Sequence, residues 1–352
     1  MNFTIHSLLG EGAFLGAVAD RALARFRDEI ILTNYLSFLK TDSESFKSVY
    51  GQTYAARMGS VIDPNSGKPI RGRRSVGKAT LEVIYMADTF QMDNHRLNEF
   101  RMLVQSLNKN GISVNEVADS ISEDFKELTL APYKRTEKIL LDLLFTGKSS
   151  VKLEDNPKGV EVVDMAIPIH MEKATTSDKG NLIGFLMDVR NRYQYLDFDR
   201  IEMSNNTFIK YFAKNPEFVG KYKVSNGGTE VEITGTVPLS AVNAMLAALG
   251  LPEIRVVSAV VTDLNDKITP LCPDDRIVFL PKGEIGKLRH FETYEEADGI
   301  PTISYTSLRG NHLIGSERTK EGRNLEYICS WVPEVRVPKN ILSVDISATM
   351  KG

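Results

Sequence analysis

The residues with the clearest chemical potential form a glycine- and lysine-containing run, Gly72-Arg73-Arg74-Ser75-Val76-Gly77-Lys78-Ala79. Up to the lysine, the spacing is that of a phosphate-binding P-loop. A P-loop then needs Ser or Thr to bind Mg²⁺, and this chain has Ala79. It also needs a buried strand before the loop and a helix after it, whereas a polar turn precedes this run and a strand pattern follows it. We therefore expect no nucleotide site, and a phosphate-binding enzyme using residues 72–78 is kept only as an alternative.

Other candidate catalytic and metal-binding residues are scattered. The histidines show neither HxxxH nor HExxH spacing, and no Gly-x-Ser-x-Gly motif supports a serine hydrolase. Two acidic groups could bind a hard cation but lack the spacing of a calcium loop, so we interpret both as solvated loop acids. We predict no catalytic residue, cofactor or metal site, and no enzyme activity. The histidines are His6, His95, His170, His290 and His312; the acidic groups are Asp197, Asp199 and Glu202, and Glu292, Glu295, Glu296 and Asp298.

Composition excludes several functional classes. The chain has 352 residues, 42% hydrophobic and 25% charged, with a net charge of −3. A protein that coats nucleic acid by charge would need many more basic residues. Cys272 and Cys329 lack metal-ligand spacing, and we expect both to be reduced core residues. No uncharged apolar run is long enough for a transmembrane helix, and residues 8–18 lack the flanking features of a signal peptide.

The basic residues of the P-loop-like run belong to a longer segment, residues 51–93, which we interpret as an extended two-stranded ribbon. Its tip, residues 63–69, is rich in Pro, Asn, Asp, Ser and Gly, which favour turns. The return arm, residues 80–86, alternates in polarity and places Leu81, Val83 and Tyr85 on one face. An isolated hairpin is marginally stable in water, so we expect this one to lie on another subunit. Its predicted inter-subunit contact residues are Arg57, Lys68, Arg71, Arg73, Arg74 and Lys78.

Helical periodicity is clear on both sides of the ribbon. Residues 16–26 have helical spacing, and residues 30–39 are strongly apolar. This N-terminal region could be a helix packed on its own domain or an arm docked on a neighbour. Residues 94–108 predict another helix. Residues 113–147 predict one long kinked helix or two in succession, with an interruption at Pro132.

The remaining chain alternates between helical and extended patterns. Helices are predicted over 182–195 and 240–249, and strands rich in Val and Ile over 254–261 and 276–280, which indicates a module with its own sheet. Three extended segments follow near the C-terminus, at 325–332, 334–337 and 341–346, and Trp331 is expected in the core. We expect these segments to pair with strands near residues 151–172.

The order of these pieces resembles the major capsid proteins of tailed bacteriophages, which have the Hong Kong 97 type fold, and most closely the lambda-type family (capsid protein E). The resemblance rests on the ribbon, on the strand 276–281 and on the C-terminal strands. It implies an α+β fold with an extended β-hairpin loop, a long spine helix, a peripheral domain and an α/β axial domain. The implied division is an N-terminal arm (1–50), an extended loop (51–93), a peripheral domain with the spine helix (94–178 and 310–352) and an axial domain (179–309).

The resemblance also implies a function and partners. Such a chain would self-assemble into hexamers and pentamers of an icosahedral phage head, formed in the host bacterial cytoplasm and enclosing double-stranded DNA without sequence-specific binding. Implied partners are copies of itself, a separate scaffolding protein, a portal protein and, in some relatives, a decoration protein; no membrane is involved. A non-viral protein compartment shell of the same fold is the alternative that the sequence leaves open.

Overall fold

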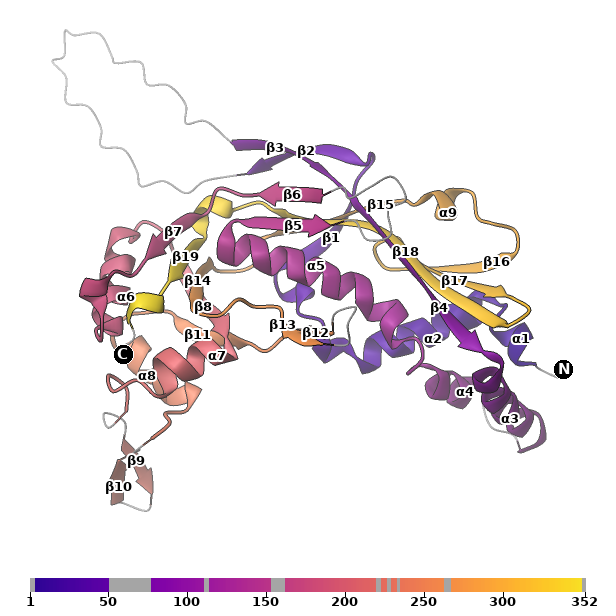
Figure 1. Cartoon of the computed structure of the whole chain (residues 1–352), viewed down its shortest axis with the longest axis horizontal. Coiled ribbons are helices and arrows are strands. Elements are labelled where there is room, and N and C mark those ends of the chain that lie inside the picture. The colour runs from indigo at the N-terminus through magenta and orange to yellow at the C-terminus, as the bar shows by residue number, and fades with distance from the viewer. Residues whose placement is uncertain are drawn as a thin grey trace, which may run out of the picture. The chain divides into compact units, whose positions relative to one another are not determined.

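The chain folds as two compact units, each built from several separate segments. The computed structural model describes residues 4–50, 77–110, 114–152, 162–219, 223–226, 229–232, 235–262 and 267–349 (Figure 1). Unit 1 comprises Met1–Ser48, Thr80–Lys138 and Gly286–Glu334; unit 2 comprises Val49–Ala79, Ile139–Ile285 and Val335–Gly352. Distant segments of the sequence must therefore meet before either core can form.

Unit 1 combines a mixed sheet with helices. Its principal strand, β18 (Gly322–Val335), pairs antiparallel with β17 (His312–Arg318) and with β4 (Ile84–Asp93). The order across the sheet is β1-β15-β18-β17-β16, with β4 also paired to β18. The other elements assigned mainly to this unit are α1 (Ile5–Leu8), α2 (Gly12–Arg25), β1 (Leu36–Lys40), α3 (Asn94–Asn110), α4 (Val114–Ile121), α5 (Lys126–Thr146), β15 (Gly286–Phe291), α9 (Tyr294–Ala297) and β16 (Ile303–Leu308).

Strand β4 corrects the predicted face of the ribbon's return arm. Ile84 and Met86 are buried, whereas Tyr85 is exposed. The sequence pattern had placed Tyr85 on the face with Leu81 and Val83. In the structure β3 (Gly77–Glu82) ends before Val83 and β4 begins after it. Because side chains alternate along a strand, a break of one residue is enough to change which set is buried.

Aromatic rings fill the core of unit 1. Trp331 is 1% exposed, as predicted, and its indole N–H donates to the Gly310 carbonyl at 2.6 Å. The Tyr133 and Trp331 rings meet edge to face with centroids 5.0 Å apart, a favoured arrangement. Phe38 packs against both rings. These residues come from α5, β18 and β1, so the aromatic cluster ties the helix and the sheet together.

The N-terminal region packs on its own unit. Helix α2 begins four residues before the predicted start and buries an apolar stripe against β16, β17 and α4. Residues 36–40 belong to the apolar run for which a packed helix and a docked arm were the alternatives. They instead form strand β1, which pairs in parallel with β15. Short apolar runs do not distinguish helix from strand by periodicity, and here a partner about 250 residues away decides. The buried residues of α2 are Phe14, Leu15, Val18, Ala19 and Ala22.

The long helical region is divided in two. Helix α3 matches its prediction, and the 113–147 region forms α4 and α5, separated by a turn over 122–125. Pro132 lies inside α5 without ending it. Among the described residues, no helix has both the length and the apolar character needed to cross a membrane.

Unit 2 is organised around a five-stranded sheet in the order β11-β8-β14-β19-β7. Strand β19 (Leu342–Asp345) pairs with β7 (His170–Lys173), as predicted for the last C-terminal segment. The prediction was wrong for the two segments before it, because β18 pairs with β4 and β17 instead. The other elements are β5 (Lys148–Lys152), β6 (Val162–Ala166), α6 (Leu182–Arg192), β8 (Phe198–Ser204), α7 (Asn205–Phe208), β9 (Lys223–Asn226), β10 (Thr229–Glu232), α8 (Leu239–Ala248), β11 (Glu253–Val257), β12 (Val260–Thr262), β13 (Ile268–Pro270) and β14 (Arg276–Pro281).

The core of unit 2 lies between this sheet and its helices. Phe279 of β14 and Ile201 of β8 are fully buried with Phe212, which follows α7. Three strand pairs lie outside the main sheet: β5 with β6, β9 with β10, and β12 with β13. The helix and strand content of both units confirms the predicted α+β class.

Candidate assembly surface

The predicted contact residues of the ribbon lie almost entirely outside the described residues. This holds for Arg57, Lys68, Arg71, Arg73 and Arg74. The backbone of Lys78 lies in β3, but its side chain is also outside the described part. Their role in inter-subunit contact therefore stays a prediction.

The base of the ribbon is described and is tied to unit 1. Strand β2 (Ser45–Tyr50) pairs with β3. The Ser48 hydroxyl donates to Glu334 Oε1 at 2.6 Å, and Arg289 Nε donates to Glu334 Oε2 at 2.7 Å. The Arg289 guanidinium also lies 4.9 Å from the centre of the Phe46 ring, within cation–π range. These contacts fix the direction in which β2 leaves the unit.

The described residues after the glycine- and lysine-containing run do not form the helix that a P-loop requires. Residues Gly77–Glu82 form strand β3, where a P-loop would begin a helix. No helix N-terminus is available there to bind a phosphate. The run of glycines and lysine is therefore not followed by the helix that a P-loop requires.

Three carboxylates lie close together on the face of the unit 1 sheet opposite the aromatic core. We define the acidic face as Glu295, Glu317 and Glu326, together with Tyr85 and Tyr305. Tyr305, Gly315 and Glu326 are register neighbours across β16, β17 and β18. A Cβ atom on Gly315 would lie 2.7 Å from Glu326 Cγ, so the missing side chain at 315 is what lets Glu326 and Tyr305 meet. The Tyr85 hydroxyl donates to Glu295 Oε1 at 3.0 Å.

The carboxylates of the acidic face repel one another. Partial burial and the charges of Glu295 and Glu317 raise the pKa of Glu326, while the Tyr305 hydroxyl opposes that shift. Burial raises the pKa of Tyr305 to about 12, together with the charge of Glu326 and the weaker effects of Glu295 and Glu317. Within the described part of the chain, no lysine, arginine or histidine forms an ion pair with these three glutamates. As far as the described residues go, the face is therefore an acidic surface without a basic partner.

The predicted loop acids have different environments from those expected. Glu202 is buried in β8, where Arg200 Nε lies 2.6 Å from its Oε1. Glu296 lies in α9 and accepts from Ser307 and Asn311. Interpreting these two, and their neighbour Glu295 in α9, as solvated loop acids was wrong. A local acidic run does not show which strand or helix covers it. Glu317 and Glu326 were missed altogether, since an isolated glutamate in an alternating strand carries no signal.

The described residues contain no site suited to metal or nucleophile chemistry. No three His, Cys, Asp or Glu side chains among them are arranged to hold a metal ion. His312 is fully buried and bonds the Leu128 carbonyl at 3.0 Å. His290 Nδ1 lies 2.6 Å from Asn311 Oδ1. Cys272 and Cys329 are buried and reduced, as predicted. Burial raises the pKa of the Cys329 thiol, so it is a poor nucleophile.

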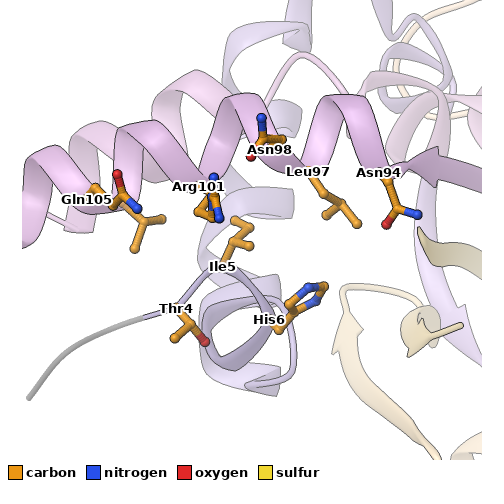
Figure 2. A pocket seen from close by; sticks show the side chains of 9 residues that line it. Thr4, Ile5, His6, Asn94, Leu97, Asn98, Arg101 and Gln105 are labelled. Carbon is orange, nitrogen blue, oxygen red and sulfur yellow. The ribbon is translucent and has the colours of Figure 1, made fainter. Parts of the chain in front are cut away.

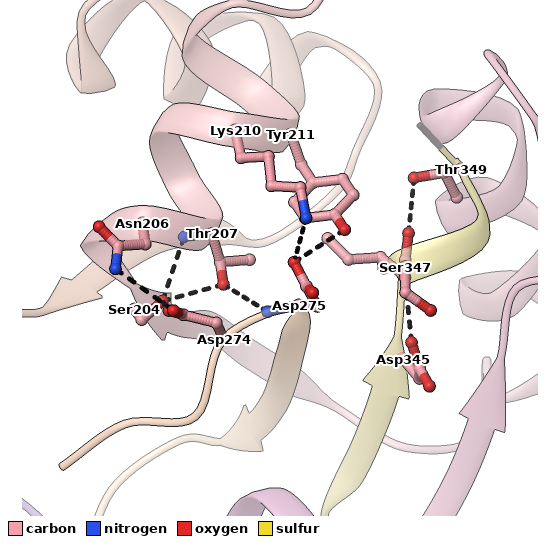
Figure 3. Close-up of polar contacts among 11 residues, drawn as sticks. Ser204, Asn206, Thr207, Lys210, Tyr211, Asp274, Asp275, Asp345, Ser347 and Thr349 are labelled. Atoms are coloured by element: carbon pink, nitrogen blue, oxygen red, sulfur yellow. Dashed lines mark hydrogen bonds and ion pairs between the residues drawn. The ribbon is translucent and has the colours of Figure 1, made fainter. Parts of the chain in front are cut away.

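A polar network in unit 2 holds neighbouring elements of the fold together (Figure 3). The Ser204 hydroxyl caps α7 by accepting from the Thr207 amide at 3.1 Å. Asp275 accepts from Lys210 Nζ at 2.7 Å and from the Tyr211 hydroxyl at 2.8 Å. The hydrogen bond with Lys210 lowers the pKa of Asp275. The network fastens α7 and the helical turn after it to the start of β14.

A cavity of about 370 Å³ in unit 1 lies between α3 and the N-terminal turn (Figure 2). Its lining contains one histidine and one arginine but no carboxylate or thiol. Such a lining does not supply the acid, base and nucleophile that catalysis combines. The lining residues are Thr4, Ile5, His6, Asn94, Leu97, Asn98, Arg101, Val104 and Gln105.

No protein family model and no curated sequence matches the chain. Among solved structures, the chain is similar to the putative capsid protein of a prophage of E. coli CFT073, with 14% identity, a TM-score of 0.52, and coverage of 96% of this chain and 99% of that one. A phage-related protein from Bordetella bronchiseptica RB50 matches with 10% identity, a TM-score of 0.46, and coverage of 94% and 96%. A virus-like particle from Pyrococcus furiosus matches with 8% identity, a TM-score of 0.42, and coverage of 94% and 99%.

Of these three structures, the prophage protein is the one whose TM-score exceeds 0.5. The match extends over nearly the whole of both chains, so the shared fold includes both units. It confirms the predicted capsid-type fold. The lambda-type assignment stays a prediction.

Proposed function

Since the chain has the fold of a phage-type major capsid protein, we propose that it is a structural protein that assembles with itself into a closed shell. In the finer proposal, hexamers and pentamers form an icosahedral phage head around double-stranded DNA. The observation that carries the proposal is the shared fold with a prophage capsid protein over 96% of this chain.

The proposed parts of the subunit follow the capsid architecture. Residues 51–93 act as the extended loop, residues 94–178 and 310–352 as the peripheral domain, and residues 179–309 as the axial domain around the centre of each capsomer. Residues 1–50 act as the N-terminal arm. The tie between Ser48, Glu334 and Arg289 supports this assignment, because a loop that reaches a neighbour needs a rigid base.

The physical mechanism is repetition of modest contacts. A closed assembly reuses the same patches in every copy. A single exposed ion pair contributes only about 0–1 kcal/mol, so the basic residues of the ribbon act through their number across the shell. A net charge of −3 also suits a wall that does not retain packaged DNA.

The proposed partners are a separate scaffolding protein, a portal protein and packaged DNA, with a decoration protein as in some relatives. The decisive experiment expresses the chain with the neighbouring scaffold gene and examines the product by sedimentation and negative-stain electron microscopy. Hollow closed particles or rings of five and six subunits are expected. A monomer or dimer under several salt conditions, with scaffold present, would overturn the proposal.

The contents of the particles distinguish a phage head from a protein compartment. Nuclease-protected double-stranded DNA in particles from the native source supports the head. A protein cargo without protected DNA would refute the finer proposal and leave the shell intact.

Deleting residues 63–78 tests the extended loop. The deletion is expected to prevent shell assembly while leaving the circular dichroism spectrum and thermal midpoint of the subunit near those of wild type. A shell of normal size and yield from the deleted chain would show that the loop is not an assembly element.

A further inference from the structure

The acidic face and the ribbon have complementary charge. Residues 66–80 contain five basic residues and no acidic one. The acidic face presents three clustered carboxylates, and all three side chains are partly buried. Several acids of unit 1 have a basic partner in the same chain, such as Asp119 with Arg21 and Asp124 with Arg96. Within the described residues, the three glutamates of the acidic face have none.

A buried oxygen on this face is also unsatisfied. Glu295 Oε2 is buried and has no hydrogen-bond partner among the described residues, while its Oε1 accepts from the Tyr85 hydroxyl. A buried acceptor without a donor is costly. A guanidinium offers several N–H donors in a planar array and matches a carboxylate well. Glu317 and Glu326 on the same face are partly exposed, so their carboxylates suit an arginine-rich ligand.

The neighbouring strand leaves room for a ligand. Strand β4 is paired on one side with β18, and in the described residues no strand pairs with its other side. Its side chains next to the acidic face are exposed, from Tyr85 through Thr89 to Gln91. An open edge of this length is a natural place for another chain to bind.

We propose that the acidic face of one subunit binds the basic segment, residues 68–78, of a second copy of this chain. The inference rests on the proposed function and identifies the surface that receives the extended loop. Binding in the same chain is disfavoured, because the extended strand from Lys78 to Tyr85 spans roughly 20 Å and β3 is already paired with β2. The contact puts basic residues beside Glu326 and Glu317 and removes their mutual repulsion.

A mixing experiment separates a contact between copies from one within a chain. One variant carries Glu317→Lys and Glu326→Lys, and the other carries Arg71→Glu, Arg73→Glu and Arg74→Glu. Each alone is expected to assemble poorly, because like charges then meet in every contact. Mixed in equal amounts, the two should recover assembly, because each loop now finds an opposite charge on the other chain.

Each outcome has a definite meaning when wild type assembles. Recovery on mixing supports the proposal. Recovery only when all five substitutions are combined in one chain places the contact within the subunit and overturns it. Normal assembly of each variant alone also overturns it, while leaving the shell function in place. A failure of wild type to assemble with scaffold instead refutes the proposed function.

A binding assay tests the same surface without a shell. A labelled peptide of residues 66–79 is titrated against the full chain and followed by fluorescence anisotropy. The isosteric variant Glu317→Gln/Glu326→Gln should bind about tenfold more weakly, the effect of a few partly buried charge pairs. Asp20→Gln, on the exposed side of α2, is the control and should bind as wild type does. Equal affinity for all three proteins, or no binding by wild type, would refute the assigned surface.

Discussion

At the scale of single residues, charge burial decides how the protein responds to pH. His312 is fully buried among Tyr133, Tyr327 and Trp331. Burial lowers its pKa from 6.5 to about 4, although its hydrogen bond with the Leu128 carbonyl opposes the shift. The unfolded chain therefore binds a proton more readily than the folded chain in this interval, and acidification favours unfolding.

The first prediction concerns His312→Gln. Wild type should lose about 3 kcal/mol of unfolding free energy from this residue as the pH falls from 6.5 to 4. The variant should lack that part of the pH dependence, even if it is less stable at neutral pH. Urea unfolding across the interval measures both slopes, with the exposed His95→Gln as control. Parallel slopes for His312→Gln and wild type would contradict the prediction.

Glu326 should act in the opposite direction. Its pKa is raised from 4.5, so the folded subunit holds the proton more tightly than the unfolded chain. Its stabilising contribution is complete at low pH and is lost as the pH rises through the raised pKa.

The second prediction is therefore that Glu326→Gln stabilises the unassembled subunit at neutral pH. The gain should be up to about 1 kcal/mol, because the site is partly exposed and solvent screens the repulsion. Thermal unfolding of wild type and variant at neutral pH and near the pKa of a free carboxyl should show the difference shrinking with acidification. A destabilised variant at neutral pH would mean that the Glu326 charge is already compensated within the subunit.

At the scale of elements, a single buried carboxylate connects the N-terminal region to α5. Glu137 is fully buried, and its Oε1 accepts from the amides of Ile31 and Leu32 at 2.6 and 3.0 Å. Lys134 also contacts Glu137, at 3.4 Å. These bonds hold the chain just before β1, which then enters the sheet beside β15.

The third prediction is that Glu137→Ala lowers the unfolding free energy by about 2–4 kcal/mol, because the buried Leu32 N–H and the partly buried Ile31 N–H lose their acceptor. Residues 26–40 should then exchange amide hydrogens faster, which hydrogen exchange with mass spectrometry can measure. Glu137→Gln keeps an acceptor oxygen and should lose less. An Ala variant with unchanged exchange in that segment would show that the aromatic cluster alone holds β1.

The turn that precedes β17 requires a glycine at position 310. Gly310 has φ +87°, and a Cβ atom there would lie 2.4 Å from the Phe38 ring. Its carbonyl also accepts the Trp331 N–H.

The fourth prediction is that Gly310→Ala costs at least about 1–2 kcal/mol from the left-handed backbone alone, with a further cost from the contact with Phe38. Chemical denaturation measures the loss. Gly283→Ala is the matched control, because its φ is also positive, at +85°, but nothing lies within 4 Å of its Cβ position. A smaller loss at Gly310 than at Gly283 would contradict the packing argument.

At the scale of the whole molecule, assembly should depend on salt more than folding does. The two units have their own cores of buried apolar side chains, and apolar burial is little affected by moderate salt. The proposed contacts between copies instead rely on charges at the surface, which salt screens over about 10 Å at 0.1 M.

The fifth prediction is that raising the salt concentration slows or prevents shell assembly at concentrations that leave the thermal midpoint of the subunit unchanged. Light scattering follows assembly, and circular dichroism follows folding. The charge-reversed loop variant, which has lost the basic partner, should show a weaker dependence on salt. Faster assembly of wild type in high salt would point to apolar contacts as the main driving force.

The sequence by itself determined the local elements and the class of fold. Periodicity located α3, α6 and α8, and hydrophobic character placed Trp331 and both cysteines in the core. These features depend on residues within a few turns or strand repeats of one another, so a single sequence contains their signal. The order of the elements was also sufficient to indicate the capsid-type fold.

Only the tertiary structure decided which distant segments meet. β1 pairs with β15 and β4 pairs with β18, each across more than two hundred residues, and no local pattern specifies such partners. The acidic face arises from this pairing, because β17 and β18 bring Glu317 and Glu326 beside a glycine and α9 adds Glu295. The interaction energy of charges depends on their distance in space, and that distance is set by strand register rather than by spacing along the chain.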